Sequence, residues 1–203
     1  MLTKIWTIGH SNLTETNFIN LLRIHQIEVV ADIRSTPFSR FAPQFNQADI
    51  RASLQNAEIQ YIYLGDTLGG RSSDDLDYID NQVQYSSLRN KHGYLKNIEK
   101  VINIARSKKL ALMCTEKNPL DCHRSILVSR DITKFSELEI IHILDENEKV
   151  SQSELINGIL RSDQKIQFSL FEENSKTIEE MLEKYEKKIA FKRSSHNTLK
   201  ESH

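Results

Sequence analysis

The chain has 203 residues, a length that suits one well-buried domain with an appendage but not two ordinary domains. Its formal charge of -1 excludes the strongly basic character of a protein that binds nucleic acid mainly by counterion release. Two cysteines exclude a disulfide framework, and no apolar run could span a bilayer or serve as a secretory signal. We therefore expect a cytoplasmic protein with reduced thiols and no membrane partner.

Five short apolar runs rich in strand-forming residues predict five β-strands. In chain order they cover residues 5–8, 29–33, 61–64, 110–114 and 140–144. Apolar residues at helical spacing separate them, over residues 18–22, 50–57 and 95–105, and Thr14 is the expected N-cap of the first helix. This alternation predicts an α/β domain whose mainly parallel five-stranded sheet has helices on both faces.

The core pattern stops after the last predicted strand. Hydrophobic residues make up 38% of the chain and charged residues 27%, which predicts that part of it is solvated. We expect an α/β core domain over residues 1–145, a helical extension over 146–193 and a disordered tail over 194–203. The extension should contain helices near residues 152–160 and 177–189.

Seven of the nine Gly and Pro residues follow closely on predicted strands. The loops after parallel strands meet at the carboxyl edge of the sheet, where open α/β folds bind ligands. Arginine presents a fixed fork of donors that matches phosphate or carboxylate, so four arginines in these loops predict an anionic ligand. The candidate ligand-binding residues are Asp32, Arg34, Ser39, Arg40, Gly69, Gly70, Arg71 and Arg124. Alternatively, the arginines form structural ion pairs with nearby carboxylates, namely Asp32, Asp66, Glu116 and Asp121.

The loop over residues 114–124 points to thiol chemistry. Pro119 can open a helix and Asp121 can cap one, which would place Cys122 in a first helical turn. The partial positive charge at that end of a helix stabilises a thiolate. Cys122 is therefore a candidate nucleophile.

Three further side chains are candidates for catalytic roles beside Cys122. We expect His123 or His10 to assist the nucleophile and Glu116 to act as a proton shuttle. Cys114 ends a predicted buried strand, and a cysteine there is more often a small packing residue.

Metal binding is the alternative for these residues. Cys122 and His123 are possible ligands, and Cys114 and His10 could complete a shell of four. The spacing Cys-x7-Cys-His matches none of the usual structural zinc patterns, so we predict no metal ligand and no cofactor.

Counting along the chain excludes three familiar sites. Leu120 and Val128 stand where the arginine of a Cys-x5-Arg phosphatase loop would be. No Gly-x-Gly-x-x-Gly fingerprint follows a predicted strand, and no Gly-x4-Gly-Lys-Ser/Thr loop is present.

Four ordered motifs resemble the domain-of-unknown-function family 488. They lie at residues 7–11, at 32–37 with 39 and 40, at 64–70, and at 113–116 with 122–124. The similarity covers about residues 4 to 145 and implies the α/β core, but no particular reaction. It also implies that a set of residues occupies the family's motif positions, namely His10, Asp32, Arg34, Arg40, Gly69, Gly70, Cys114, Glu116, Cys122, His123 and Arg124.

A short motif outside that region suggests a protein partner. Residues 167–171, Gln-Phe-Ser-Leu-Phe, are similar to the peptide with which bacterial replication and repair proteins dock on the sliding clamp. Leu170 and Phe171 would enter an apolar pocket, while Gln167 would fix the register by hydrogen bonds. The alternative is that these apolar side chains pack against the core.

Three functional hypotheses follow. The leading one is a cysteine-dependent enzyme that acts on a nucleotide or nucleic acid at the carboxyl edge of the sheet. The second is a non-catalytic module that binds a phosphate-bearing ligand or a nucleic-acid end. The third is a structural domain stapled by a metal.

Overall fold

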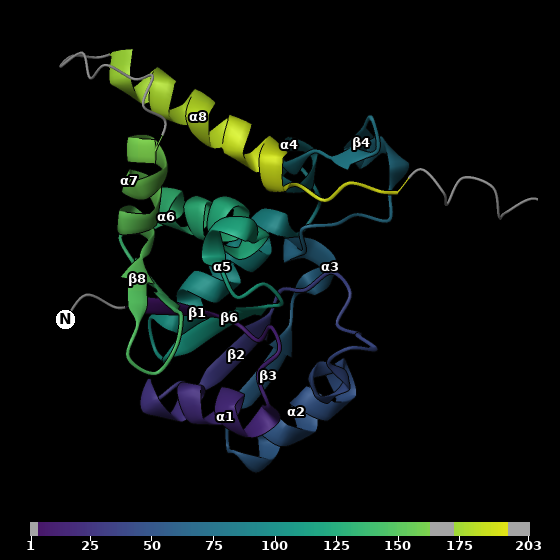
Figure 1. The fold of residues 1–203 in the computed structure, drawn as a ribbon, viewed down its shortest axis with the longest axis vertical. Coiled ribbons are helices and arrows are strands. Elements are labelled where there is room, and N and C mark those ends of the chain that lie inside the picture. The colour runs from purple at the N-terminus through teal and green to yellow at the C-terminus, as the bar shows by residue number, and fades with distance from the viewer. Residues whose placement is uncertain (1–3, 163–172, 195–203) are drawn as a thin grey trace, which may run out of the picture.

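The computed structural model describes residues 4–162 and 173–194, and its centre is a six-stranded sheet in the order β3-β2-β6-β1-β7-β8 (Figure 1). The strands are β1 Lys4–Gly9, β2 Val29–Asp32, β3 Gln60–Tyr63, β6 Leu110–Cys114, β7 Glu139–Ile143 and β8 Lys149–Ser151. The first five are parallel and correspond to the five predicted runs. The predicted α/β fold with a mainly parallel sheet is confirmed.

The sixth strand, β8, was not predicted. It pairs antiparallel with β7 at the edge of the sheet and is only three residues long. An edge strand pairs on one side only, and none of its residues is fully buried, so it needs no apolar run.

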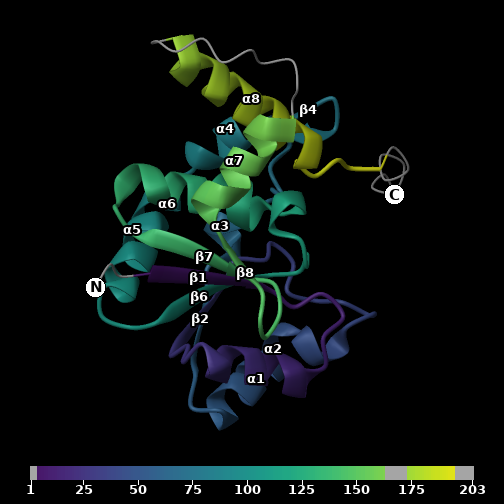
Figure 2. The same ribbon diagram turned by 60° about the vertical axis from the view of Figure 1, so that its left-hand side comes forward.

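Helices cover both faces of the sheet (Figures 1 and 2). One face carries α1 Glu15–Ile24 and α2 Gln47–Asn56, and the other carries α5 Tyr94–Ala105, the π-helical turn η4 Arg124–Ser129 and α6 Arg130–Phe135. Successive strand residues point to opposite sides: Val30 packs with α1 and α2, whereas Val29 and Ala31 pack with α5. Both faces are therefore buried, which explains the nearly continuous apolar strands.

The boundaries of α1 and α5 follow from local chemistry. Thr14 is the N-cap of α1 as predicted, because its hydroxyl accepts a hydrogen bond of 3.2 Å from the backbone N–H of Asn17. In α5 one stripe residue is misplaced by the sequence pattern: Leu95 is 51% exposed, and its neighbour Tyr94 is buried instead. Tyr94 is held inside because its hydroxyl donates to the buried carboxylate of Asp131 at 2.7 Å.

Shorter segments lie in the loops. They are α3 Gly65–Leu68, α4 Tyr85–Arg89, the 3₁₀ turns η1 Pro43–Phe45, η2 Asp75–Asp77 and η3 Pro119–Asp121, and the hairpin of β4 Tyr78–Ile79 with β5 Gln82–Val83. No helix among the described residues has the length and apolar character needed to cross a membrane.

The predicted C-terminal helices are present as α7 Gln152–Ser162 and α8 Glu173–Ile189. Leu182 of α8 packs with Ile126 of η4, so α8 lies against the helical layer rather than apart from it. After α8 the chain runs beside the β4–β5 hairpin, where the carbonyl of Phe191 accepts a hydrogen bond from the N–H of Val83 at 3.0 Å (Figure 1).

Two predictions fall on residues outside this description. The clamp-binding peptide, with Gln167, Leu170 and Phe171, lies in the stretch 163–172, and nearly all of the expected disordered tail lies in 195–203. Both remain predictions.

Candidate active site

The three central strands β2, β6 and β1 place the candidate residues. Because β6 lies between β1 and β2, the loop that follows it is flanked by the loops after both neighbours. The N–H of His10 donates to the carbonyl of Cys114 at 2.9 Å, and the N–H of Ile33 donates to that of Met113 at 3.1 Å. The three loops are therefore tied together at the carboxyl edge of the sheet.

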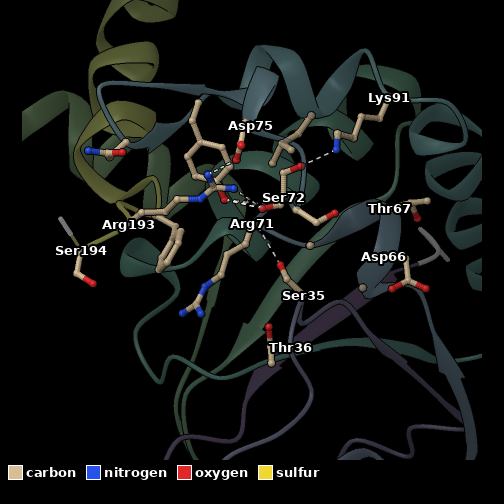
Figure 3. A pocket seen from close by; sticks show the side chains of 17 residues that line it. Ser35, Thr36, Asp66, Thr67, Arg71, Ser72, Asp75, Lys91, Arg193 and Ser194 are labelled. Atoms are coloured by element: carbon tan, nitrogen blue, oxygen red, sulfur yellow. Dashed lines mark hydrogen bonds and ion pairs between the residues drawn. The ribbon is translucent and has the colours of Figure 1, made fainter. Parts of the chain in front are cut away.

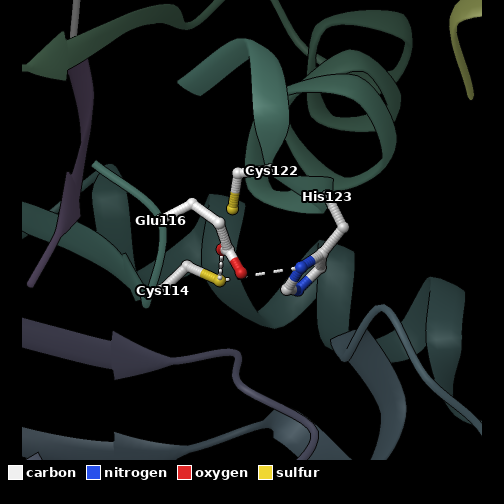
Figure 4. Close-up of side chains that lie close together, drawn as sticks. All are labelled: Cys114, Glu116, Cys122 and His123. Atoms are coloured by element: carbon white, nitrogen blue, oxygen red, sulfur yellow. Dashed lines mark hydrogen bonds between the residues drawn. The ribbon is translucent and has the colours of Figure 1, made fainter. Parts of the chain in front are cut away.

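Four side chains form a cluster at this edge: Cys114, Glu116, Cys122 and His123 (Figure 4). One ligand atom from each of the four, a sulfur, a carboxylate oxygen or a ring nitrogen, lies within 4.8 Å of the other three. The Cys114 sulfur is 3.1 Å from Glu116 Oε2 and 3.6 Å from His123 Nδ1. Both cysteines are buried and free, as expected, but Cys114 has polar partners and is more than a packing residue.

The turn before Cys122 differs from the expectation in its cap. Pro119 does open a helical turn, η3, but the capping side chain is Asn118, whose oxygen accepts from the N–H of Leu120 at 3.1 Å. Asp121 lies inside η3 and accepts from the Asn118 side-chain amide at 2.8 Å. Asn118 caps because it directly precedes the proline, where the first free N–H groups of the turn point.

Cys122 lies just before the next helical segment rather than in its first turn. Its carbonyl accepts from the N–H of Ser125 at 3.2 Å, and its sulfur accepts from the N–H of Arg124 at 3.4 Å. The sulfur therefore occupies the place of an N-cap side chain, where a backbone N–H and the end of the helix favour negative charge.

The pKa values of the two thiols are shifted in opposite directions. Burial raises the pKa of Cys114, and the neighbouring Cys122 raises it further. Burial also opposes ionisation of Cys122, but the hydrogen bond from the Cys114 thiol, the charge of Arg124 and contact with His123 outweigh it, and the pKa of Cys122 lies well below its usual value. Of the two thiols, Cys122 is therefore the one that ionises more readily.

His123 and Glu116 complete the charge pattern. Burial lowers the pKa of His123, but the Cys122 thiolate more than compensates, so this pKa is raised. His123 Nε2–H donates to the carbonyl of Ile33 at 3.0 Å, which turns Nδ1 toward the sulfurs. Burial, and then the Cys122 thiolate, raise the pKa of Glu116.

Gly70 holds the imidazole in place by its lack of a side chain. A Cβ at this position would stand 2.7 Å from His123 Cγ and 2.9 Å from its Nδ1. The backbone therefore packs directly against the ring, which accounts for Gly70. Gly69 is confined in the same way, because a Cβ there would meet the Gly65 carbonyl and the Ser35 hydroxyl at 2.3 Å.

Arg124 was expected at the rim, but it is completely buried beneath the cluster. Its guanidinium donates to the carbonyls of Glu116 and Lys117 and, at 3.3 Å, to the hydroxyl of Thr7. Because of these contacts the side chain faces inward, and it fastens the loop after β6 to β1. Gly9 allows this approach, since a Cβ there would be 1.8 Å from the Glu116 carbonyl oxygen.

Arg34 forms a structural ion pair with Asp32, which was the alternative to binding an anionic ligand. It forms two parallel hydrogen bonds with Asp32, of 2.9 Å to Oδ1 and 2.6 Å to Oδ2, and both side chains are buried. His10, expected to assist Cys122, is instead stacked on Phe45 with ring centroids 4.2 Å apart, and its Nε2 accepts from Arg34 at 3.1 Å. Burial, then the Arg34 charge, lower the pKa of His10 to about 4. His10 is thus a neutral support for Arg34, outside the cluster.

A crevice of about 300 Å³ opens above the cluster. Its lining includes the cluster residues Cys114, Glu116 and His123 on one side of the division that we make, and the loop residues Arg71 and Ser39 on the other. We call these two parts the floor and the mouth. Ser39 uses its hydroxyl within its own loop, accepting from the N–H groups of Phe41 and Ala42 at 3.2 Å each.

Arg71 and Arg40 differ from the two buried arginines. Both are exposed, and neither forms an ion pair with any residue of 4–162 or 173–194. The Arg71 guanidinium lies 4.1 Å from the centroid of the Phe191 ring. Of the four predicted anion-binding arginines, these two keep their charge available at the surface, although Arg40 is not among the residues that line the crevice.

A second crevice, of about 870 Å³, adjoins the first and shares Ser35, Thr36, Arg71 and Phe191 with it. Figure 3 shows the Arg71 guanidinium apart from the ion pair of Arg193 with Asp75. Ser35 fixes this corner, because its hydroxyl accepts from the N–H of Arg71 at 2.9 Å.

Sequence reasoning missed the part of the site that the C-terminal region supplies. Ile189 and Phe191, at and beyond the end of α8, line the first crevice, as does Tyr85 of α4. One signal was present: Ile189, Ala190 and Phe191 interrupt a strongly charged stretch, which is unusual for a solvated helix end.

The cluster also has the donor types that suit a thiophilic cation. Two cysteines, a histidine and a carboxylate are ordinary zinc ligands. The far ring nitrogen of His123 is hydrogen-bonded to the Ile33 carbonyl, as is common for a histidine that binds a metal. The fourth donor is Glu116 rather than His10, which the sequence had suggested.

A family model described as "Domain of unknown function DUF488" matches residues 15–130, more than half of the chain. The match contains three of the four motifs and the whole cluster, whereas the motif at residues 7–11 precedes it. Neither a search of curated proteins nor a search of solved structures found a match.

Proposed function

The chain belongs to the DUF488 family, a domain of unknown function, and we propose from its site that it is a cysteine-dependent enzyme acting on a nucleotide or nucleic-acid substrate. Cys122 is the nucleophile in this proposal. His123 and Glu116 handle protons, and Cys114 stabilises the thiolate by donating a hydrogen bond to it.

The observation that carries the proposal is the cluster of Cys122 with Cys114, Glu116 and His123 beside a crevice, in which the pKa of Cys122 is lowered and that of His123 is raised. The thiolate is the reactive form of cysteine, and neutral pH leaves an ordinary thiol mostly protonated. Structural packing requires no such state, because a buried cysteine packs equally well as a thiol. A thiolate in a site with a crevice favours catalysis.

The neighbouring groups suit a group-transfer step. The Cys122 sulfur would form a bond to an electrophilic atom of the substrate, and the bond between that atom and its leaving group would break. Burial raises the pKa of Glu116, which favours its protonated form, and in this proposal that carboxyl gives a proton to the leaving group.

The size and charge of the crevice limit the substrate. Cys122 lies behind Cys114, Glu116 and His123, so only a small reacting group reaches its sulfur. Arg71 at the mouth has no carboxylate partner among the described residues, which supports a substrate that carries phosphate.

Alkylation of the thiols as a function of pH tests the proposal. We expect the wild-type protein to react with a small alkylating reagent with a midpoint well below about 8.5, the value for an ordinary thiol. Cys122→Ser should lose this reactive population. Cys114→Ser, which still donates a hydrogen bond, should keep the low midpoint, whereas Cys114→Ala should raise it.

Two results would contradict the proposal that the protein is a cysteine-dependent enzyme. A midpoint at or above the ordinary thiol value would show that Cys122 is not held as a thiolate. One tightly held metal ion per chain, with both thiols protected from alkylation until a chelator is added, would favour the metal-stapled structural domain instead.

A further inference from the structure

The loop between β2 and α2 exposes two aromatic side chains, one of which lines the crevice. Phe41 is fully exposed, and Phe38, which lines the crevice, is 63% exposed. Large apolar side chains normally gain stability by burial, and Phe41 gains none from its own fold. Two exposed phenylalanines three residues apart beside a candidate active site suggest contact with a ligand.

This loop is held in place by its own hydrogen bonds. The backbone N–H of Ser39 donates to Asn46 Oδ1 at 2.7 Å. The Ser39 hydroxyl accepts from the backbone N–H groups of Phe41 and Ala42. Ala42 and Phe45 then return the chain to the core, where both are buried. The outward position of the two phenylalanines is therefore fixed before any ligand binds, which lowers the entropy lost on binding.

Cations accompany these aromatic side chains. Arg40 lies between Phe38 and Phe41 in the chain, and Arg71, which lines the crevice as Phe38 does, has its guanidinium 4.1 Å from the centroid of the Phe191 ring. Both guanidinium groups lack a carboxylate partner within the part of the chain that the structure describes.

From this arrangement we infer that the mouth and the adjoining loop over residues 38–41 bind single-stranded nucleic acid, with bases stacked on Phe38 and Phe41 and phosphates held by Arg40 and Arg71. The inference rests on the proposed function and names its substrate class. Unpaired bases stack readily on aromatic rings, and arginines along the strand bind the phosphates. A protein that covered the phenylalanines with an apolar pocket would leave both guanidinium groups without partners, so the charges favour the nucleic acid.

Fluorescence anisotropy with a labelled oligothymidylate and the full chain tests this site. Phe41→Ala should weaken binding by roughly five- to hundredfold, the usual effect of removing one stacking side chain. The logarithm of affinity should fall with the logarithm of salt concentration with a slope of about -1.4 for two phosphate contacts, and Arg40→Gln should reduce this slope by about 0.7. A duplex should bind more weakly, because its bases are already stacked on one another.

Phe135→Ala is the matched control, since Phe135 is 57% exposed at the end of α6 and lies near the opposite edge of the sheet. It should bind like the wild type. Equal losses in Phe41→Ala and Phe135→Ala, equal affinity for duplex and single strand, or no binding to the oligonucleotide would overturn the inference. Loss of binding to a protein but not to the oligonucleotide in Phe41→Ala would also overturn it, by assigning the mouth to a protein partner.

The thiol titration separates this inference from the enzyme proposal, because it needs no oligonucleotide. Strand binding with the expected losses, combined with an ordinary Cys122 pKa, would leave a nucleic-acid-binding module and remove the enzyme. A reactive Cys122 in a protein that binds no strand would leave the enzyme and remove the single-stranded substrate.

Discussion

The floor of the crevice and its mouth contain the same residue types and use them in opposite ways. Arg34 and Arg124 at or below the floor give their hydrogen bonds to Asp32 and to backbone carbonyls. Arg71 at the mouth and Arg40 in the adjoining loop have no ion pair with a described carboxylate. A guanidinium therefore stabilises the fold where carboxylate or carbonyl oxygens lie within hydrogen-bond distance. Where the fold supplies none, the guanidinium stays available to a ligand.

The largest expected effect comes from breaking a brace at the floor. Arg34→Gln leaves the buried Asp32 carboxylate without its ion-pair partner and should lower the free energy of unfolding by about 3–5 kcal/mol. Arg71→Gln changes an exposed side chain and should alter it by less than about 0.5 kcal/mol. Urea denaturation of both variants measures the difference.

A double-mutant cycle sharpens this result. Asp32→Asn combined with Arg34→Gln removes both charges and should recover part of the stability lost in either single variant. Additive losses would show that the two side chains act independently, and a loss in Arg71→Gln as large as that in Arg34→Gln would erase the distinction between floor and mouth.

The fold was accessible from the sequence because its main signals are local. The central strands β2 and β6 are buried on both faces and therefore read as apolar runs. Thr14 shows its capping role through its neighbours. β8 was not accessible, since three residues at a sheet edge are held by pairing with β7 rather than by their own composition.

The site was accessible only in part. The loops after parallel strands share one edge of the sheet, so the sequence predicts that the loops with Arg34 and Cys114 lie close together. Whether an arginine faces inward depends on distances between distant segments: Arg124 reaches backbone carbonyls seven and eight residues before it, and Arg71 meets a ring 120 positions later. No periodicity in the chain records such contacts.

Acid should lower the free energy of unfolding, because two buried histidines resist protonation in the folded protein. Burial lowers the pKa of His10 and of His142 to about 4, with the charges of Arg34 and Arg124 respectively adding to the effect. Between pH 6.5 and about 4 the unfolded chain binds protons that the folded protein excludes, so the free energy of unfolding falls as the pH falls. Each histidine should contribute about 3 kcal/mol of this loss once the pH is below 4.

Thermal or urea unfolding at several pH values tests this dependence. His142→Gln keeps a polar side chain between Thr7 and Gln152 and should flatten the decline below pH 6.5. His92→Gln, at an exposed position, is the control and should leave the decline unchanged. A His142→Gln protein that is as acid-sensitive as the wild type would show that this histidine does not exclude protons.

The smallest expected effect concerns the loop that presents the mouth. Ser39→Ala removes the acceptor used by the N–H groups of Phe41 and Ala42 and should lower the free energy of unfolding by about 1 kcal/mol. The loss should be local, because Ala42 and Phe45 still anchor the loop in the core, so hydrogen exchange at the two amides should quicken while exchange in the central strands stays unchanged. Ser39→Thr keeps the hydroxyl and should restore protection, and Ser73→Ala, at an exposed loop position, should have no effect. If both amides remain protected in Ser39→Ala, the rigidity of the mouth comes from elsewhere, and the preorganised position of Phe41 loses its explanation.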